Sequence, residues 1–175
     1  MLKSTIVDDN CDSVETPEEA IQLIRDLRSL YTSAGLDIRK WASNSSEVLA
    51  TVEDGDKATD LIFSYDFDPH SKLPKIKALG VIWLAETDKF TFLSEINVNQ
   101  VWTKRTVLSA YSKLFDPLGL ISPVAIIARV IVQTCWRHNI DWDEKLPDKI
   151  SYLWEKWLKA LGDLPKLRIN RCIKP

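Results

Sequence analysis

Cysteine and glycine are scarce in this chain, and long apolar runs are missing. The three cysteines (Cys11, Cys135 and Cys172) lie far apart and form no C-x-x-C pair, which argues against a disulfide framework or a zinc knuckle. The most apolar stretch, residues 118–136, is interrupted by polar residues and proline, so it lacks the ~20 consecutive apolar residues of a transmembrane helix. Residues 1–10 show no apolar core of signal-peptide length. We therefore expect an intracellular, cytoplasmic protein without a membrane partner.

Charge is distributed unevenly along the 175 residues, although the formal net charge is only -2. Residues 1–70 carry six Lys and Arg against fifteen Asp and Glu, whereas residues 71–175 carry seventeen against ten. The first part is therefore acidic and the second basic. Such asymmetry is a hint that the basic part contacts nucleic acid, although a solvated surface is the commoner explanation of any single charged stretch.

The N-terminal part of the sequence predicts strands around one helix. Residues 1–7 are rich in apolar and β-branched side chains and lead into the polar turn 8–10, as in a strand that enters a hairpin. Residues 36–41 are predicted to return as a strand. Residues 43–60 are predicted to be a polar connection with one short helical turn.

The helix between these strands has clear ends. Thr16 is a suitable N-cap, Pro17 occupies the first helical position, Glu19 follows three residues after the cap, and Gly35 supplies the stop. Its apolar residues advance by three and four positions, so they form one face. We expect that face to pack on a sheet.

The rest of the chain changes from strands to helices. Residues 76–85 and 89–93 are β-type runs on either side of an acidic turn, which predicts a hairpin. Three helices are then predicted over Lys104–Phe115, from Ser122–Pro123 to about His138, and over Pro147–Leu161. In the last of these, Trp154 and Trp157 share a stripe with leucines, which favours core packing over base stacking. The fold class is therefore α+β, with strands first and helices afterwards.

The sharpest local feature is the acid pair Asp8–Asp9 in the sequence IVDDN. Two adjacent carboxylates repel each other, and a divalent cation can neutralise them. An Asp-Asp pair in an ordinary surface turn is, however, the commoner case. The pair alone therefore does not decide between a metal site and a turn.

The wider succession of motifs resembles the second half of a retroelement reverse transcriptase, specifically the BEL/Pao retrotransposon Pol polyprotein. The resemblance covers nearly the whole chain, and its most distinctive stretches are RKWASNS and FDPLGLISP. It implies the C-terminal half of the polymerase (palm hairpin, primer grip and thumb) running into the Pao family region. The implied parts are a partial palm over residues 1–100 and a helical, thumb- or connection-like region over residues 101–175.

The resemblance also implies roles for particular residues. Asp8 and Asp9 match the metal-binding pair of the polymerase palm, so the implied cofactor is Mg²⁺, used in two-metal nucleotidyl transfer. Lys40 falls near the lysine that would donate a proton to pyrophosphate, although a solvent-facing lysine at a strand end is an equal alternative. The implied primer grip contains Leu79, Gly80 and Trp83. The implied phosphate contacts of the thumb are Lys104, Arg105 and Lys113.

The implied partners are an RNA/DNA primer-template duplex and the remainder of the Pol polyprotein, in a cytoplasmic particle. A reverse transcriptase also needs fingers and another palm acid, and this sequence begins at the hairpin. We therefore expect a reverse-transcriptase fragment that does not polymerise by itself. The alternative is a non-catalytic structural or nucleic-acid-binding remnant.

Family naming also attaches an aspartic peptidase label to the Pao region. Such peptidases place their paired aspartates in Asp-[Ser/Thr]-Gly loops. This chain contains no Asp-[Ser/Thr]-Gly sequence. Its one Asp-Gly is Asp54–Gly55, which is preceded by Glu53. We therefore expect the peptidase label to have no matching site here.

Overall fold

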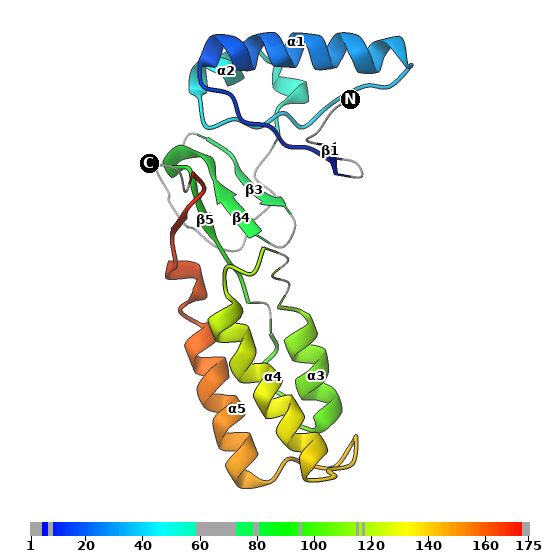
Figure 1. Ribbon diagram of the computed structural model, residues 1–175, viewed down its shortest axis with the longest axis vertical. Coiled ribbons are helices and arrows are strands. Elements are labelled where there is room, and N and C mark those ends of the chain that lie inside the picture. The colour runs from blue at the N-terminus through cyan, green and yellow to red at the C-terminus, as the bar shows by residue number, and fades with distance from the viewer. Residues whose placement is uncertain are drawn as a thin grey trace. The chain divides into compact units, whose positions relative to one another are not determined.

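The computed structural model has a mixed α+β fold and describes residues 5–6, 9–58, 73–78, 81–94, 96–114, 116 and 118–172, with backbone alone at residues 5, 6, 9 and 78. The α+β class predicted from the sequence is confirmed. The chain divides into two compact units. The N-terminal unit contains the long helix α1, and the C-terminal unit contains a helical bundle with most of a β-sheet (Figure 1).

The N-terminal unit begins with a small hairpin followed by α1. Strand β1 (Thr5–Ile6) pairs antiparallel with β2 (Asp9–Asn10), so the predicted hairpin is confirmed. Helix α1 (Pro17–Ser33) begins where its cap predicts, because the side chain of Thr16 accepts a hydrogen bond from the backbone N–H of Glu19. Gly35, with φ +73°, follows its end.

Helix α1 packs against a short helix rather than on a sheet, contrary to the expectation. Helix α2 (Ser46–Ala50) is capped by Ser45, and the 3-10 helix η1 (Asp54–Asp56) follows it. Leu27 of α1 is buried, as are Val48 and Leu49 of α2. The predicted short helical turn within residues 43–60 is confirmed.

The predicted strand over residues 36–41 is wrong. Residues 36–40 have no regular structure, and only Trp41 forms an isolated parallel bridge, with Lys57. Two local features explain the difference. Lys40 has a φ of +61°, which is incompatible with an extended strand, and the side chains of Arg39 and Asp37 pair within the segment.

The larger of the two described sheets contains four strands in the order β3-β4-β5-β6. They are β3 (Lys75–Ala78), β4 (Val81–Leu84), β5 (Lys89–Thr91) and β6 (Ile169–Asn170). Strands β4 and β5 pair antiparallel across the 3-10 helix η2 (Ala85–Thr87), which confirms the predicted hairpin. Strand β6, from the end of the chain, adds itself antiparallel to β5.

All three predicted C-terminal helices are confirmed. They are α3 (Lys104–Ser112), α4 (Ser122–Arg137) and α5 (Asp148–Leu161), and the 3-10 helix η3 (Leu164–Lys166) follows α5. Thr103 caps α3 in a reciprocal capping box with Thr106. Helix α4 lies between the other two and packs against both (Figure 1).

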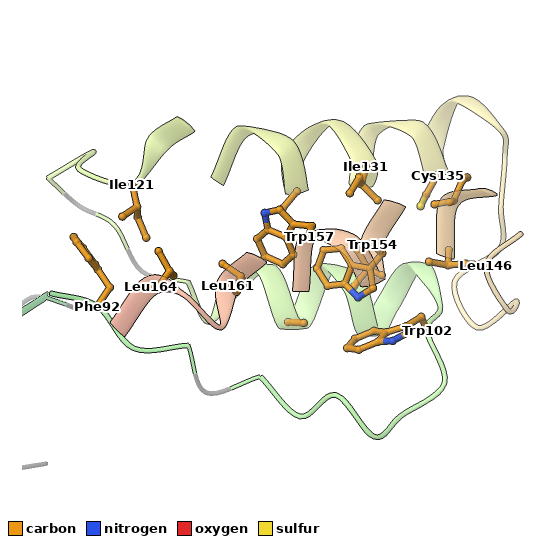
Figure 2. Packing of buried hydrophobic residues seen from close by; sticks show 14 of the residues in the cluster. Phe92, Trp102, Ile121, Ile131, Cys135, Leu146, Trp154, Trp157, Leu161 and Leu164 are labelled. Carbon is orange, nitrogen blue, oxygen red and sulfur yellow. The ribbon is translucent and has the colours of Figure 1, made fainter. Parts of the chain in front are cut away.

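One hydrophobic cluster runs through the bundle and continues to β4 and the residue after β5. Trp154 is fully buried, stacks on Trp157 with ring centroids 4.6 Å apart, and meets the edge of Trp102 at 5.4 Å. Figure 2 shows these three rings in the middle of the cluster, with Phe92 and Ile121 at one end. The predicted core role of Trp154 and Trp157 is therefore confirmed.

Candidate nucleic-acid interface

The hairpin formed by β1 and β2, which contains Asp9, contacts α1 through hydrogen bonds between two side chains. Asn10 Nδ2 donates to Tyr31 Oη at 3.0 Å, and Tyr31 Oη donates to Asn10 Oδ1 at 3.3 Å. Asp9 belongs to β2, while its side chain lies outside the description, as does Asp8 as a whole. The structure therefore places the hairpin but not the two carboxylates, and their metal-binding role stays a prediction.

Lys40 lies in an irregular loop with its side chain exposed. The motif RKWASNS around it has clear structural tasks. Trp41 exchanges backbone hydrogen bonds with Asp56 and Ala58, and Ser45 caps α2. The proton-donor role of Lys40 stays a prediction, now for a residue in a left-handed backbone conformation rather than at a strand end.

Of the expected primer grip, Leu79 and Gly80 lie outside the described residues, and Trp83 lies in β4. The Trp83 indole N–H donates to Asp88 Oδ1 at 2.9 Å. Arg171 holds the same carboxylate with two bonds, Nε to Oδ1 at 2.6 Å and an Nη2 contact to Oδ2 at 3.0 Å. This arrangement fastens β6 to the β4–β5 turn.

Asp88 is tuned by two opposing effects. Burial raises the pKa of its carboxyl, but the hydrogen bonds from Arg171 and Trp83 together outweigh burial, so the pKa lies below its usual range. Its φ of +50° places it in the left-handed region. Trp83 therefore has a defined structural partner, and its contact with a primer stays a prediction.

Lys104 is buried beside two tryptophan rings, although lysine side chains usually lie in solvent. Its side chain is buried, and Nζ lies 5.2 Å from the ring centroid of Trp136 and 4.9 Å from that of Trp142. The two rings meet edge-on at 5.6 Å. Burial raises the pKa of the neighbouring Cys135 thiol, although Lys104 opposes that effect. For Lys104 to bind a phosphate, its ammonium would have to leave both rings.

Arg105 and Lys113, at opposite ends of α3, differ in their surroundings. Arg105 donates from Nε and Nη2 to the two carboxylate oxygens of Asp143 at 2.8 and 3.0 Å, a bidentate pair that lowers the pKa of Asp143. Its guanidinium also lies over Trp142. Lys113 is the C-cap of α3 and is exposed. Phosphate binding by these residues stays a prediction; among the described residues Arg105 has an ion-pair partner and Lys113 has none.

The described part of the other distinctive motif, FDPLGLISP, consists of Asp116 and residues 118–123 and leads into α4. The Asp116 carboxylate accepts hydrogen bonds from the backbone N–H groups of Leu120 and Ile121, both at 2.9 Å. Gly119 has a φ of +70°, which suits glycine. This motif therefore positions the start of a helix.

Helix α5 presents a group of cationic residues that sequence reasoning missed. Lys149, Lys156 and Lys159 are exposed, and Tyr152, which is 65% exposed, lies among them. At 100° per residue these four positions fall within one sector of the helix, opposite the buried tryptophans. The spacing of these lysines is visible in the sequence, but the interpretation of this helix considered only its apolar stripe.

Among the described residues, no three or more His, Cys, Asp or Glu side chains form a group that could hold a metal ion. Within the same residues, no helix combines the length and apolar character needed to cross a bilayer. We therefore derive no metal-dependent step from the described side chains.

Comparison with known families agrees with one part of the resemblance. Residues 103–175 match the family model described as "Pao retrotransposon-like RNaseH-like domain". The match begins at the cap of α3 and includes α3, α4, α5 and β6. No curated protein and no solved structure matches the chain.

The match supports a protein related to Pao retrotransposon Pol, as predicted. Its description names an RNaseH-like domain rather than a reverse-transcriptase palm or thumb. The polymerase assignment, the division at residue 100 and the residue roles attached to them stay predictions.

Proposed function

We propose that the chain is part of the Pol machinery of a Pao-type retrotransposon and that its C-terminal unit binds nucleic acid. The observation that carries the proposal is the Pao match over the whole helical bundle. The excess of Lys and Arg in residues 71–175 supports it, because nucleic-acid affinity comes largely from cations that neutralise phosphates. In this proposal the described residues bind nucleic acid and carry out no chemical step.

The finer assignment to a reverse transcriptase belongs to this proposal. It is supported by the small hairpin that contains Asp9, by the contact of Asn10 with Tyr31, and by the second hairpin formed by β4 and β5. In this assignment Asp8 and Asp9 would hold Mg²⁺ in the polymerase, which would supply metal-assisted phosphoryl transfer. Lys40, Trp83 and Lys113 would contact the reactants or the duplex.

The binding proposal is tested with the purified chain and a fluorescent RNA/DNA primer-template duplex. Anisotropy titrations between 50 and 200 mM salt should give an affinity that falls linearly on a log-log plot, as release of counterions requires. Lack of binding at 50 mM salt would overturn the proposal.

The absence of autonomous chemistry is tested separately. Primer extension with Mg²⁺ and nucleotides should give no product. An assay for cleavage of the RNA strand should also be negative; RNA cleavage is the second candidate activity, suggested by the words "RNaseH-like". Incorporation that disappears in Asp8→Asn would contradict the proposed absence of a chemical step and favour a working polymerase. RNA cleavage that persists in Asp8→Asn would favour the nuclease.

A further inference from the structure

Helix α5 has two faces with opposite tasks. Ile150, Trp154, Trp157 and Leu161 are buried in the bundle. The opposite face is exposed and carries Lys149, Tyr152, Lys156 and Lys159. Since the apolar side is occupied by the protein's own core, the outward side is the part of α5 that can meet a partner.

The three lysines of that face are unpaired within the part of the chain that the structure describes. Among the described residues, no side-chain hydrogen bond or ion pair involves Lys149, Lys156 or Lys159, in contrast to Lys166, whose Nζ lies 2.7 Å from Asp163 Oδ1. The acids of the helix, Asp148 and Glu155, lie beside Lys159, within about 40° of it at 100° per residue. Of these, Glu155 accepts a hydrogen bond from Ser151 Oγ at 3.5 Å. The lysines therefore keep their capacity to bind an external anion.

The spacing of the lysines suits an extended polyanion better than a single small anion. From Lys149 to Lys159 the helix rises about 15 Å, at 1.5 Å per residue. One strand of a B-form duplex presents about four phosphates over that length, at 3.4 Å each. Tyr152 lies between the first and second lysine, where its exposed ring could stack on an unpaired base.

We propose that Lys149, Lys156 and Lys159, with Tyr152 among them, form a binding track for the phosphate backbone of nucleic acid. This proposal rests on the nucleic-acid-binding function proposed above and identifies the surface that performs it. The track is different from the α3 positions expected from the sequence, where Lys104 is buried between two tryptophans and Arg105 is paired with Asp143.

Two other anionic partners fit the structure less well. An interfacial helix binds a membrane by burying its apolar face in the lipid, but the apolar face of α5 is already buried in the bundle. An acidic protein segment would satisfy the lysines but gives no particular use for the exposed Tyr152 ring. Nucleic acid is also the partner of the proposed function, which rests on the Pao match that includes α5.

The decisive experiment compares the full chain with the triple variant Lys149→Gln, Lys156→Gln, Lys159→Gln. The control is Arg25→Gln, Lys57→Gln, Lys77→Gln, which removes equal charge from positions outside α5. Anisotropy with the same duplex is measured from 50 to 200 mM salt, and circular dichroism verifies that each variant is folded. Three lost phosphate contacts should reduce the log-log slope by about 2.7, while the control keeps the slope of the wild type. Over this fourfold salt range, that difference corresponds to about a 40-fold change in relative affinity.

The outcomes separate this inference from the broader proposal. If the wild type does not bind the duplex, the proposed function fails. If the wild type binds and the α5 variant keeps its salt slope, the track is wrong although the function survives. If the control variant lost as much of the salt slope as the α5 variant, the effect would come from net charge alone, and the track would also be wrong. Binding of the wild type to anionic phosphatidylserine vesicles or to polyglutamate, but not to duplex, would replace nucleic acid with the corresponding partner.

Discussion

The two units of the molecule use charge and apolar surface in opposite ways. In the described part of the N-terminal unit, buried apolar side chains are few, and three acids form ion pairs: Asp56 with Arg28, Asp54 with Lys57, and Asp37 with Arg39. In the C-terminal unit a continuous cluster runs through three helices and the adjoining strands. There the lysines on the outward face of α5 are without partners among the described residues.

This difference refines the interpretation of the charge asymmetry. Because residues 1–70 hold fifteen acids and six cations, ion pairing leaves that region net negative, whereas the unpaired lysines on helix α5 present positive charge to solvent. Exposed ion pairs add little stability, so the N-terminal unit depends on several weak contacts. We expect stability to be concentrated in the C-terminal unit, which can then hold its lysines in fixed positions.

The largest expected effect comes from Trp154→Ala. Trp154 is fully buried and touches two other tryptophans, so its removal should leave a cavity and cost about 3–5 kcal/mol of unfolding free energy. Urea denaturation followed by circular dichroism measures the loss. Tyr152→Ala, two residues away on the exposed face, is the matched control and should change stability by about 0.5 kcal/mol or less. Similar losses in the two variants would show that the bundle does not hold its core around Trp154.

Trp154→Phe sharpens this measurement. The Trp154 Nε1 atom is buried and has no hydrogen-bond partner among the described residues, which is an unfavourable state for an N–H group. Phenylalanine keeps an aromatic ring and removes that donor. We expect a smaller loss than for alanine, because the lost packing is partly offset by the removal of the unsatisfied group.

Much of the bundle could be predicted because its helix signals are local. Thr103 caps α3, and Gly162 follows α5, where the pattern places them. The failed strand at residues 36–41 lies beside a contact that is not local: Trp41, next to the left-handed Lys40, bridges to Lys57, sixteen positions along the chain. Local β-propensity does not contain that information.

The candidate site could be predicted only in part, for the same physical reason. The sequence indicates which charged residues can bind phosphate, but not which of them are buried or paired within the folded protein. Lys104 is buried because Trp136 and Trp142, more than thirty residues later, meet around it. The track on α5, by contrast, follows from helical periodicity once the buried stripe is known.

A smaller, pH-dependent effect is expected from Asp88→Asn, which tests how β6 is held in the C-terminal unit. Asparagine tolerates the left-handed conformation at this position and keeps the shape of the side chain, but it loses the charge that binds Arg171. We expect a loss of about 1–2 kcal/mol at pH 7. Because the folded-state pKa of Asp88 is lowered, its stabilising effect is present above the unfolded pKa of about 4 and disappears as the pH falls through the lower folded value.

The difference between the urea midpoints of the wild type and Asp88→Asn should therefore be smaller at pH 3 than at pH 7. Asp163→Asn is the control, since Asp163 and Lys166 form an exposed pair of the kind that contributes about 0–1 kcal/mol. A constant difference between wild type and Asp88→Asn across this pH range would mean that the carboxylate charge does not stabilise the contact with Arg171.

The smallest effect is expected in the N-terminal unit, from Arg28→Met. Arg28 Nη2 lies 3.0 Å from Asp56 Oδ2, and its guanidinium lies over Trp41, so the residue connects α1 with the loop before α2 and with η1. Both groups of the ion pair are partly exposed, so we expect a loss of about 0.5–1 kcal/mol. Hydrogen exchange should show faster exchange at the amide N–H groups of Trp41 and Ala58, which close this loop, with little change in α5.

Arg25→Met is the matched control, because Arg25 is an exposed residue of the same helix without an ion pair among the described residues. It should leave exchange at both loop amides unchanged. If Arg28→Met accelerated exchange in α5 as strongly as in the loop, the two units would unfold together. The contrast between a weakly held acidic unit and an independently stable basic one would then be wrong, and the fixed geometry proposed for the lysines of α5 would depend on both.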